Sequence, residues 1–512
     1  MRRHTALTGA VAAATLVVPL QLVALPPASA VDEVNTKRLR DAVTVNGILA
    51  HERALQRIAN DNDGTRASGT PGYEASLTYV AGQLRRAGYH VRRQAFTFPF
   101  YRELAAPTLA QVSPTATTYE SATFDYSPTG DVTGTLVPTT DVQVPPTPAP
   151  ASTSGCEPAD FPPAPAGPAV ALVQRGTCTF EDKATNAAAA GYEAVVIFNE
   201  GQPGRTELLT GTLGNPGTIP AVGIGFADGQ ALYQAAQAGP VTVRVATSTE
   251  VDPARTTWNL LADSPRGDAS RTVVVGAHLD SVAAGPGIND NGSGTATILE
   301  IAKQMSRLNV VPRQKLRFAF WGAEEAGLLG SEHYVASLSD AQLGRIYANL
   351  NFDMLGSPNY VRFVYDGDGS GDPDAAGPPG SAQIESVFTD YFAAQGLASE
   401  PTAFDGRSDY GPFIDVGIPA GGLFSGAEGV KTPEQAAVYG GTAGEPYDRC
   451  YHEACDTIDN LSTKALAELG DAAAHATMTL ARTRSGLFED GSRAAARSAG
   501  PRLEHSGHAP VR

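Results

Sequence analysis

The sequence predicts an α/β fold: a mixed β-sheet flanked by helices, with a β-rich segment inserted into the chain. From about residue 250 to 484, short apolar runs typical of strands alternate with helical patterns. One such run, 273–278, ends in His278, as expected of a buried strand that delivers an imidazole to its carboxyl edge. Residues 122–247 instead lack long amphipathic helices and are rich in Val, Gly, Thr and Pro. Because 512 residues exceed what one core usually serves, we expect two domains.

The first 30 residues have the form of a signal peptide. Two arginines precede an uncharged run over 6–25, and residues 28–30 (Ala-Ser-Ala) form a small-x-small cleavage sequence. A retained membrane anchor is the alternative, but three prolines and the cleavage sequence favour removal. No later segment is long and apolar enough to span a bilayer, so we expect a secreted, soluble protein.

The chain is acidic, with a formal net charge of −17 that removal of residues 1–30 makes two units more negative. Such acidity disfavours binding to nucleic acids or to anionic membranes. It does not identify a substrate. We expect a monomer.

The four cysteines suit two disulfides in an oxidising compartment. Proximity in the sequence favours pairing Cys156 with Cys178 and Cys450 with Cys455. A structural zinc site made of all four cysteines is the rival interpretation. The two pairs lie far apart in the chain and neither has C-x-x-C spacing, so we predict disulfides.

The elements expected in chain order are helices at 34–60 and 73–88, a strand at 90–101, strands at 169–173 and 194–198 around a short helix at 181–190, strands ending near 278, 321 and 353, and a terminal helix at 460–482. The proline-rich stretch 145–168 is expected to be an extended loop or partly disordered. After Phe488 the tail is rich in Arg, Ala and Gly without periodicity, which predicts a disordered or processed segment.

Two imidazoles and several carboxylates occur where strands or Gly-rich loops end, which is where open α/β sheets place their sites. Such ligands suit zinc, and a bridging carboxylate can hold two ions roughly 3.5–4 Å apart. One further carboxylate would supply a general base, and consecutive glutamates can divide the two roles. The residues are His278, Asp290, Glu324, Glu325, Asp353 and His452.

Five motifs closely resemble the secreted bacterial dizinc leucine aminopeptidases: HLDS at 278–281, GINDNGSG at 287–294, WGAEEAG at 321–327, NFDM at 351–354 and YH at 451–452. The resemblance covers residues 65–105 and 255–483. It implies that His278 and Asp353 hold one zinc, that Glu325 and His452 hold the other, that Asp290 bridges them and that Glu324 is the general base.

The same resemblance implies further roles around the site. Tyr451 matches a tyrosine that hydrogen-bonds the oxyanion, and Arg407 matches an arginine near the substrate. Phe424 would stand in the apolar wall of the first-residue pocket, favouring Leu, Met or Phe at the peptide amino terminus. The Asp290–Asn291 peptide bond is expected to be cis. Asp280 is more readily a carboxylate that orients His278 than a ligand.

A second resemblance concerns the inserted segment. RGTCTF at 175–180 and AAAAGY at 187–192 resemble the protease-associated (PA) domain, whose role here could be to gate substrates, to bind peptides or only to cover the catalytic domain. The expected organisation is a signal peptide at 1–30, a first catalytic part at 31–121, the PA insert at 122–247, a second catalytic part at 248–484 and the tail at 485–512.

Simpler interpretations exist for each residue alone. Asp290 could cap the following helix, the paired glutamates could be surface charge, and Tyr451 or Phe424 could only pack; their joint occurrence argues against this.

Two other functions remain open. A glutamate-releasing carboxypeptidase would need a basic cluster, whereas only Arg407 is found. A non-catalytic binding protein of the transferrin-receptor type would lack ligands or base. We predict a secreted dizinc aminopeptidase acting on peptide amino termini, and the sequence does not decide whether calcium also binds.

Overall fold

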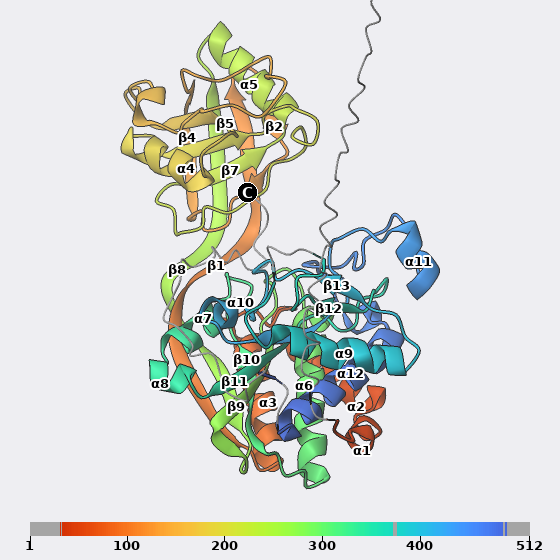
Figure 1. Cartoon of the computed structure of the whole chain (residues 1–512). Coiled ribbons are helices and arrows are strands. Elements are labelled where there is room, and N and C mark those ends of the chain that lie inside the picture. Colours follow the sequence, from red (N-terminus) through yellow and green to blue (C-terminus); the bar gives the residue numbers. More distant parts are fainter. Residues whose placement is uncertain (1–30, 32, 372–375, 485–486, 489–512) are drawn as a thin grey trace, which may run out of the picture.

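The computed structural model describes residues 31, 33–371, 376–484 and 487–488. The predicted signal peptide, and the predicted tail apart from residues 487–488, lie outside the described residues. Figure 1 shows an α/β part below and a smaller, β-rich part above, joined by two long strands that run through both, β1 (His90–Ser113) and β8 (Thr242–Asp263). None of the described helices combines the length and apolarity needed to cross a membrane.

The α/β part is organised by four neighbouring parallel strands, in the order β14 (Ala420–Phe424), β11 (Ile346–Phe352), β9 (Asp268–His278) and β10 (Gln314–Trp321). Beyond β14 the sheet continues with β12 (Phe363–Tyr365) and β13 (Glu400–Thr402), and beyond β10 with antiparallel β8. Every residue of β11 is buried, as expected of a central parallel strand covered on both faces. The predicted mixed sheet is confirmed.

Helices cover both faces of this sheet (Figure 1). Five helices cover one face: α2 (Val45–Asn60), α3 (Pro71–Arg86), α6 (Gly294–Arg307), α9 (Ser381–Ala394) and α12 (Thr463–Arg482). Their apolar side chains share one core with β9, β10 and β11. The short helix α1 (Lys37–Arg40) packs on α12. The other face carries α7 (Leu329–Ala336), α8 (Asp340–Leu343) and α10 (Gly411–Asp415). There Trp321 packs its ring 5.2 Å from Tyr334 and 6.0 Å from Phe413. The remaining helix, α11 (Pro433–Tyr439), lies to one side.

The β-rich part contains four neighbouring parallel strands, β4 (Gly130–Pro138), β5 (Ala169–Gln174), β6 (Ala194–Phe198) and β7 (Ala221–Ile224). It also contains the short strands β2 (Thr117–Tyr119) and β3 (Ala122–Thr123) and the helices α4 (Phe180–Ala189) and α5 (Phe226–Ala238). The predicted elements β5, α4 and β6 agree to within a residue. Helix α5 was not predicted, because it buries only Gly229 and Leu232 and so has a weak apolar pattern. The predicted loop 145–168 contains one 3₁₀ turn, Pro158–Asp160.

Several predicted boundaries change, and the helix expected at 73–88 lies two residues earlier, as α3. The helix expected over 34–60 is split, because the Thr44 side chain accepts a hydrogen bond from Gly47 N and begins α2 anew. The terminal helix begins after Ser462, which caps Ala465 N, rather than at residue 460. Strand β1 continues twelve residues past Tyr101, because β8 pairs with it up to its last residue, Ser113.

Both predicted disulfides, Cys156–Cys178 and Cys450–Cys455, are confirmed, and the rival four-cysteine zinc site is thereby excluded. Two residues of the expected disordered or processed tail are packed. Leu487 is buried, and the ring of Phe488 lies 5.6 Å from that of Tyr347.

Candidate metal centre and substrate pocket

The candidate site lies at the carboxyl edge of the parallel strands. His278 is the last residue of β9, Asp353 directly follows β11, and Glu324 and Glu325 follow the end of β10. Because these strands are parallel neighbours, their ends deliver the four side chains to one place.

Two loops complete the group. Asp290 lies in the turn Ile288–Ser293 that leads into α6, and the Asp290–Asn291 peptide is cis, as expected. Gly294 lets this turn approach β11, since a Cβ there would lie 2.2 Å from the carbonyl oxygen of Phe352. His452 lies in the short loop closed by the Cys450–Cys455 disulfide.

The donor atoms converge in two groups that share Asp290. Nε2 of His278 lies 3.2 Å from a carboxylate oxygen of Asp353 and 3.2 Å from Oδ1 of Asp290. Nε2 of His452 lies 3.3 Å from Oδ2 of the same aspartate and 3.0 Å from Glu325. The two oxygens of Asp290 therefore face different imidazoles.

These separations fit metal coordination. Ligands at the usual zinc distances, arranged as a tetrahedron, lie about 3.3 Å from one another. Imidazole nitrogens and carboxylate oxygens are also the donors that zinc accepts. Glu324 stands further away, with a carboxylate oxygen 3.9 Å from Nε2 of His278. The group thus has the composition and spacing for two ions, with one extra carboxylate beside them.

The buried carboxylates of the cluster create a negative charge that bound cations would stabilise. Burial raises the pKa of Glu324 well above its usual range, and the carboxylates of Asp409 and Asp353 add to this against the opposing effect of His278. Burial likewise raises the pKa of Glu325, opposed by His452, and that of Asp409 to about 8. Divalent ions would offset this crowding of buried negative charge.

Asp456, which sequence reasoning missed, holds the Asp290 turn. Its two carboxylate oxygens accept hydrogen bonds from Asn289 N at 2.8 Å and from Asp290 N at 2.9 Å. Asp448 supports the same turn by accepting from the side chain of Asn289 at 2.6 Å. The only signal in the sequence was that Asp456 directly follows Cys455.

Arg66 was also missed, because residues 66–72 are only a loop in the sequence. Its fully buried guanidinium donates to the carbonyl oxygens of Pro286, Gly287 and Leu279. It thereby ties the end of β9 to the turn that carries Asp290.

His278 and Asp353 are each held from behind. Nδ1 of His278 lies 3.2 Å from the backbone oxygen of Asp280 and 3.7 Å from its carboxylate, so the main chain makes the closer contact. The hydroxyl of Ser408 donates to Asp353 at 2.5 Å and accepts from the side chain of Asn351 at 2.8 Å.

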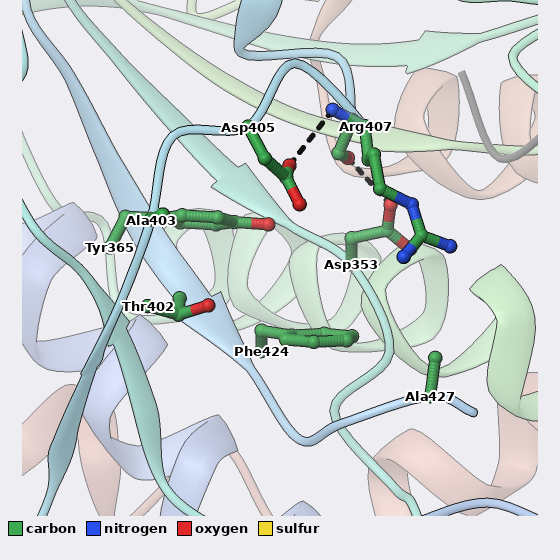
Figure 2. Close-up of a pocket in the computed structure, with 9 residues that line it drawn as sticks. Asp353, Tyr365, Thr402, Ala403, Asp405, Arg407, Phe424 and Ala427 are labelled. Atoms are coloured by element: carbon green, nitrogen blue, oxygen red, sulfur yellow. Dashed lines mark hydrogen bonds between the residues drawn. The ribbon is translucent and has the colours of Figure 1, made fainter. Parts of the chain in front are cut away.

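A pocket opens beside Asp353 (Figure 2). Its cavity is about 40 Å³, and its lining includes Tyr365, Thr402, Arg407, Phe424 and Ala427. Figure 2 shows the Phe424 ring forming one wall and the Arg407 side chain reaching over Asp353. The structure therefore places the two predicted substrate residues in one pocket next to the cluster.

Tyr451 lies between the pocket and the cluster. Its ring stacks on that of His452, with the ring centroids 3.9 Å apart. Its hydroxyl lies 3.4 Å from Nη2 of Arg407, whose other terminal nitrogen donates to Glu428 at 2.8 Å. Burial and the carboxylates of Asp290 and Glu325 raise the pKa of Tyr451 well above its usual value of 10.0, so the hydroxyl keeps its proton.

Comparison with known proteins agrees with this geometry. Residues 259–477 match Peptidase family M28, and residues 132–232 match the PA domain. An aminopeptidase of Pseudomonas aeruginosa is 48% identical over 444 residues, which are 85% of this chain and 80% of that protein. Leucine aminopeptidase 2 of Arthroderma otae is 38% identical over 89% of this chain and 88% of its own length.

The fold also matches a solved structure, that of a zinc aminopeptidase from Bacillus subtilis. The TM-score is 0.61 at 25% sequence identity, covering 89% of this chain and 98% of the other. Together with the sequence matches, this establishes that the chain belongs to Peptidase family M28 and carries a PA domain.

Proposed function

We propose that this chain is a secreted dizinc aminopeptidase that removes large hydrophobic residues from peptide amino termini. The observation that carries the proposal is the sharing of Asp290 between two groups of donor atoms at zinc-ligand spacing, beside a small pocket. The names of its relatives, aminopeptidase and leucine aminopeptidase, support the same activity.

The ligand assignment follows from the two groups. His278 and Asp353 would hold one ion, Glu325 and His452 the other, and Asp290 would contact both. When bound, zinc supplies Lewis acidity, which lowers the pKa of water and polarises a carbonyl group.

Glu324 acts as the general base. It accepts a proton from the attacking water and passes it to the nitrogen of the leaving peptide. Its greater distance from His278 favours this role over that of a ligand.

Tyr451 stabilises the developing oxyanion. Its raised pKa keeps the hydroxyl protonated, so that it can donate a hydrogen bond to the substrate oxygen. Arg407 lies within 3.4 Å of that hydroxyl and fixes its position at the mouth of the pocket.

The pocket explains both the exopeptidase action and the preference. The carboxylates of Glu324 and Asp353 would hold the free α-amino group, so that the amino-terminal side chain enters the pocket beside Asp353. A cavity of about 40 Å³ has space for about three water-sized groups. The Phe424 ring in its wall favours an apolar side chain such as that of Leu, Met or Phe.

The organisation of the chain completes the proposal. Residues 31–121 and 248–484 would form the catalytic domain and residues 122–247 the PA insert, with 1–30 removed on export. The two disulfides support an oxidising compartment outside the cytosol.

The test is hydrolysis of leucine p-nitroanilide and of an acidic dipeptide, each with and without a chelator, with zinc content measured by mass spectrometry. We expect cleavage of the leucine substrate that chelation abolishes and zinc restores, and two zinc ions per chain. Cleavage of the acidic dipeptide alone would instead identify a glutamate-releasing carboxypeptidase. Absence of both zinc and cleavage would indicate a non-catalytic protein.

A further inference from the structure

A groove runs from the metal centre to the β-rich insert. Its first section is a cavity of about 470 Å³ that begins at Glu325 and His452, passes the aromatic residues of β1, and reaches Asp125 and Tyr126 of the insert. A second cavity of about 600 Å³ shares Glu103 and Asp125 with the first and continues between β1 and the insert. We call this continuous feature the exit groove.

The position of the exit groove fits the leaving part of a peptide. If the amino-terminal residue fills the small pocket beside Asp353, the scissile bond lies at Glu324 and the proposed metal ligands. The rest of the chain must then depart past Glu325 and His452, where the exit groove opens. Its first section is within the size range of ligand-binding clefts.

The wall between β1 and the insert is already assembled. The ring of Tyr126 lies 5.7 Å from that of Tyr101, and its hydroxyl donates to the carbonyl oxygen of Pro99 at 3.2 Å. Phe98 and Phe100 line the same section. Such aromatic surfaces suit the aliphatic stems of lysine and arginine side chains.

The charged residues that line the exit groove where β1 meets the insert are all acidic. Glu103 and Asp125 line both sections, and no lysine or arginine is among the residues that line either. Burial raises the pKa of Asp125 to about 6, and the nearby Glu103 carboxylate adds to the shift. Glu103 is fixed by a hydrogen bond from Thr123 at 3.0 Å.

The neighbouring cations are already paired. Arg102 bonds Glu250 at 2.8 Å, and Arg255 bonds the same glutamate at 2.6 Å while its guanidinium lies over the ring of Phe100. They therefore do little to neutralise Glu103 and Asp125.

We propose that the exit groove binds the leaving part of the peptide and that Glu103 and Asp125 select a lysine or arginine within the first residues after the scissile bond. The inference rests on the proposed aminopeptidase function. It gives the insert a specificity role, because Asp125 and Tyr126 reach the groove from outside the α/β part.

The experiment compares kcat/KM for the tetrapeptides Leu-Lys-Ala-Ala, Leu-Ala-Lys-Ala, Leu-Glu-Ala-Ala and Leu-Ala-Glu-Ala. We expect the wild-type enzyme to favour Lys over Glu at one of the two positions by about 3- to 10-fold, the size expected of a partly buried ion pair. The E103Q/D125N double variant should reduce that ratio to within about twofold, and E103Q alone should lower it in part.

The control matched to E103Q is Glu193→Gln, which removes one negative charge from an exposed position that lines neither cavity. It should leave the Lys-to-Glu ratio unchanged. An equal ratio in the wild-type enzyme, or an equal fall in E193Q and in the double variant, would overturn the inference. Leucine p-nitroanilide separates the two proposals: an enzyme that cleaves it without Lys preference refutes the groove alone, whereas one that does not cleave it refutes the aminopeptidase.

Discussion

Asp456 is not one of the proposed metal ligands, yet it holds Asp290, the residue that two ions would share. Its two carboxylate oxygens accept the backbone N–H groups of Asn289 and Asp290. In Asp456→Asn one oxygen becomes an NH₂ group facing an N–H donor, so one of these bonds is lost. Because partners behind metal ligands typically contribute 10- to 100-fold, we expect zinc affinity or activity to fall by about that factor.

The control for this substitution is Asp459→Asn, three residues away on the exposed side of the same loop. It should leave zinc affinity, measured by competition with a chelator, unchanged. Equal affinities for the wild-type protein and D456N would show that Asp456 does not position Asp290.

Residues of this kind mark the limit of what the sequence could predict. His278, Glu324 and Asp353 could be predicted to lie near one another because each stands at or just after the end of a strand, where this kind of fold places its sites. Arg66 and Asp456 follow no such pattern. Their partners lie more than 150 residues away in the chain, so only the folded structure shows them.

The loop at 450–455 shows how a short element can matter for the site more than for stability. The Cys450–Cys455 disulfide closes only five residues around His452, so the loop-closure entropy it removes is modest. Replacing both cysteines with serine should therefore lower zinc occupancy or activity more than the melting temperature of the metal-free protein.

The Cys156–Cys178 pair is the matched control. It spans 22 residues inside the β-rich part, so its loss should cost about 3 kcal/mol of stability and leave zinc occupancy of the folded protein intact. Unchanged turnover with a collapsed melting temperature in C450S/C455S would contradict the role given to the shorter loop.

Among the elements, agreement between sequence and structure followed the strength of the local pattern. Strands β5 and β6 are short, continuous apolar runs, and they were predicted to within a residue. Helix α5 and the far half of β1 were missed. The first has a weak apolar face, and the second is an extended strand because β8 lies beside it.

At the scale of the whole molecule, we expect the buried acidic cluster to couple metal binding to folding. Without cations, carboxylates such as Glu324 and Asp409 are buried together, and their raised pKa values reflect the cost of ionising them. We expect zinc to raise the melting temperature and a chelator to lower it. Free zinc at a hundredfold excess over its Kd stabilises the native state by about 2.7 kcal/mol for each independent site.

Differential scanning calorimetry of the metal-free and zinc-loaded protein checks this. Magnesium is the control, because it prefers oxygen ligands and retains its waters. A melting temperature that is insensitive to zinc and chelator alike would show that the cluster does not bind the metal.

The most direct test of the central claim compares Glu324→Gln with Glu325→Gln. In the first variant the amide cannot accept the proton from water and the proposed ligands are untouched, so zinc content should persist while kcat falls about 10²–10⁴-fold. In the second a ligand carboxylate is lost, so one zinc site should lose occupancy. Loss of zinc in E324Q, with both ions retained and only the rate reduced in E325Q, would reverse the assignment of base and ligand. Full activity in both variants would contradict the site altogether.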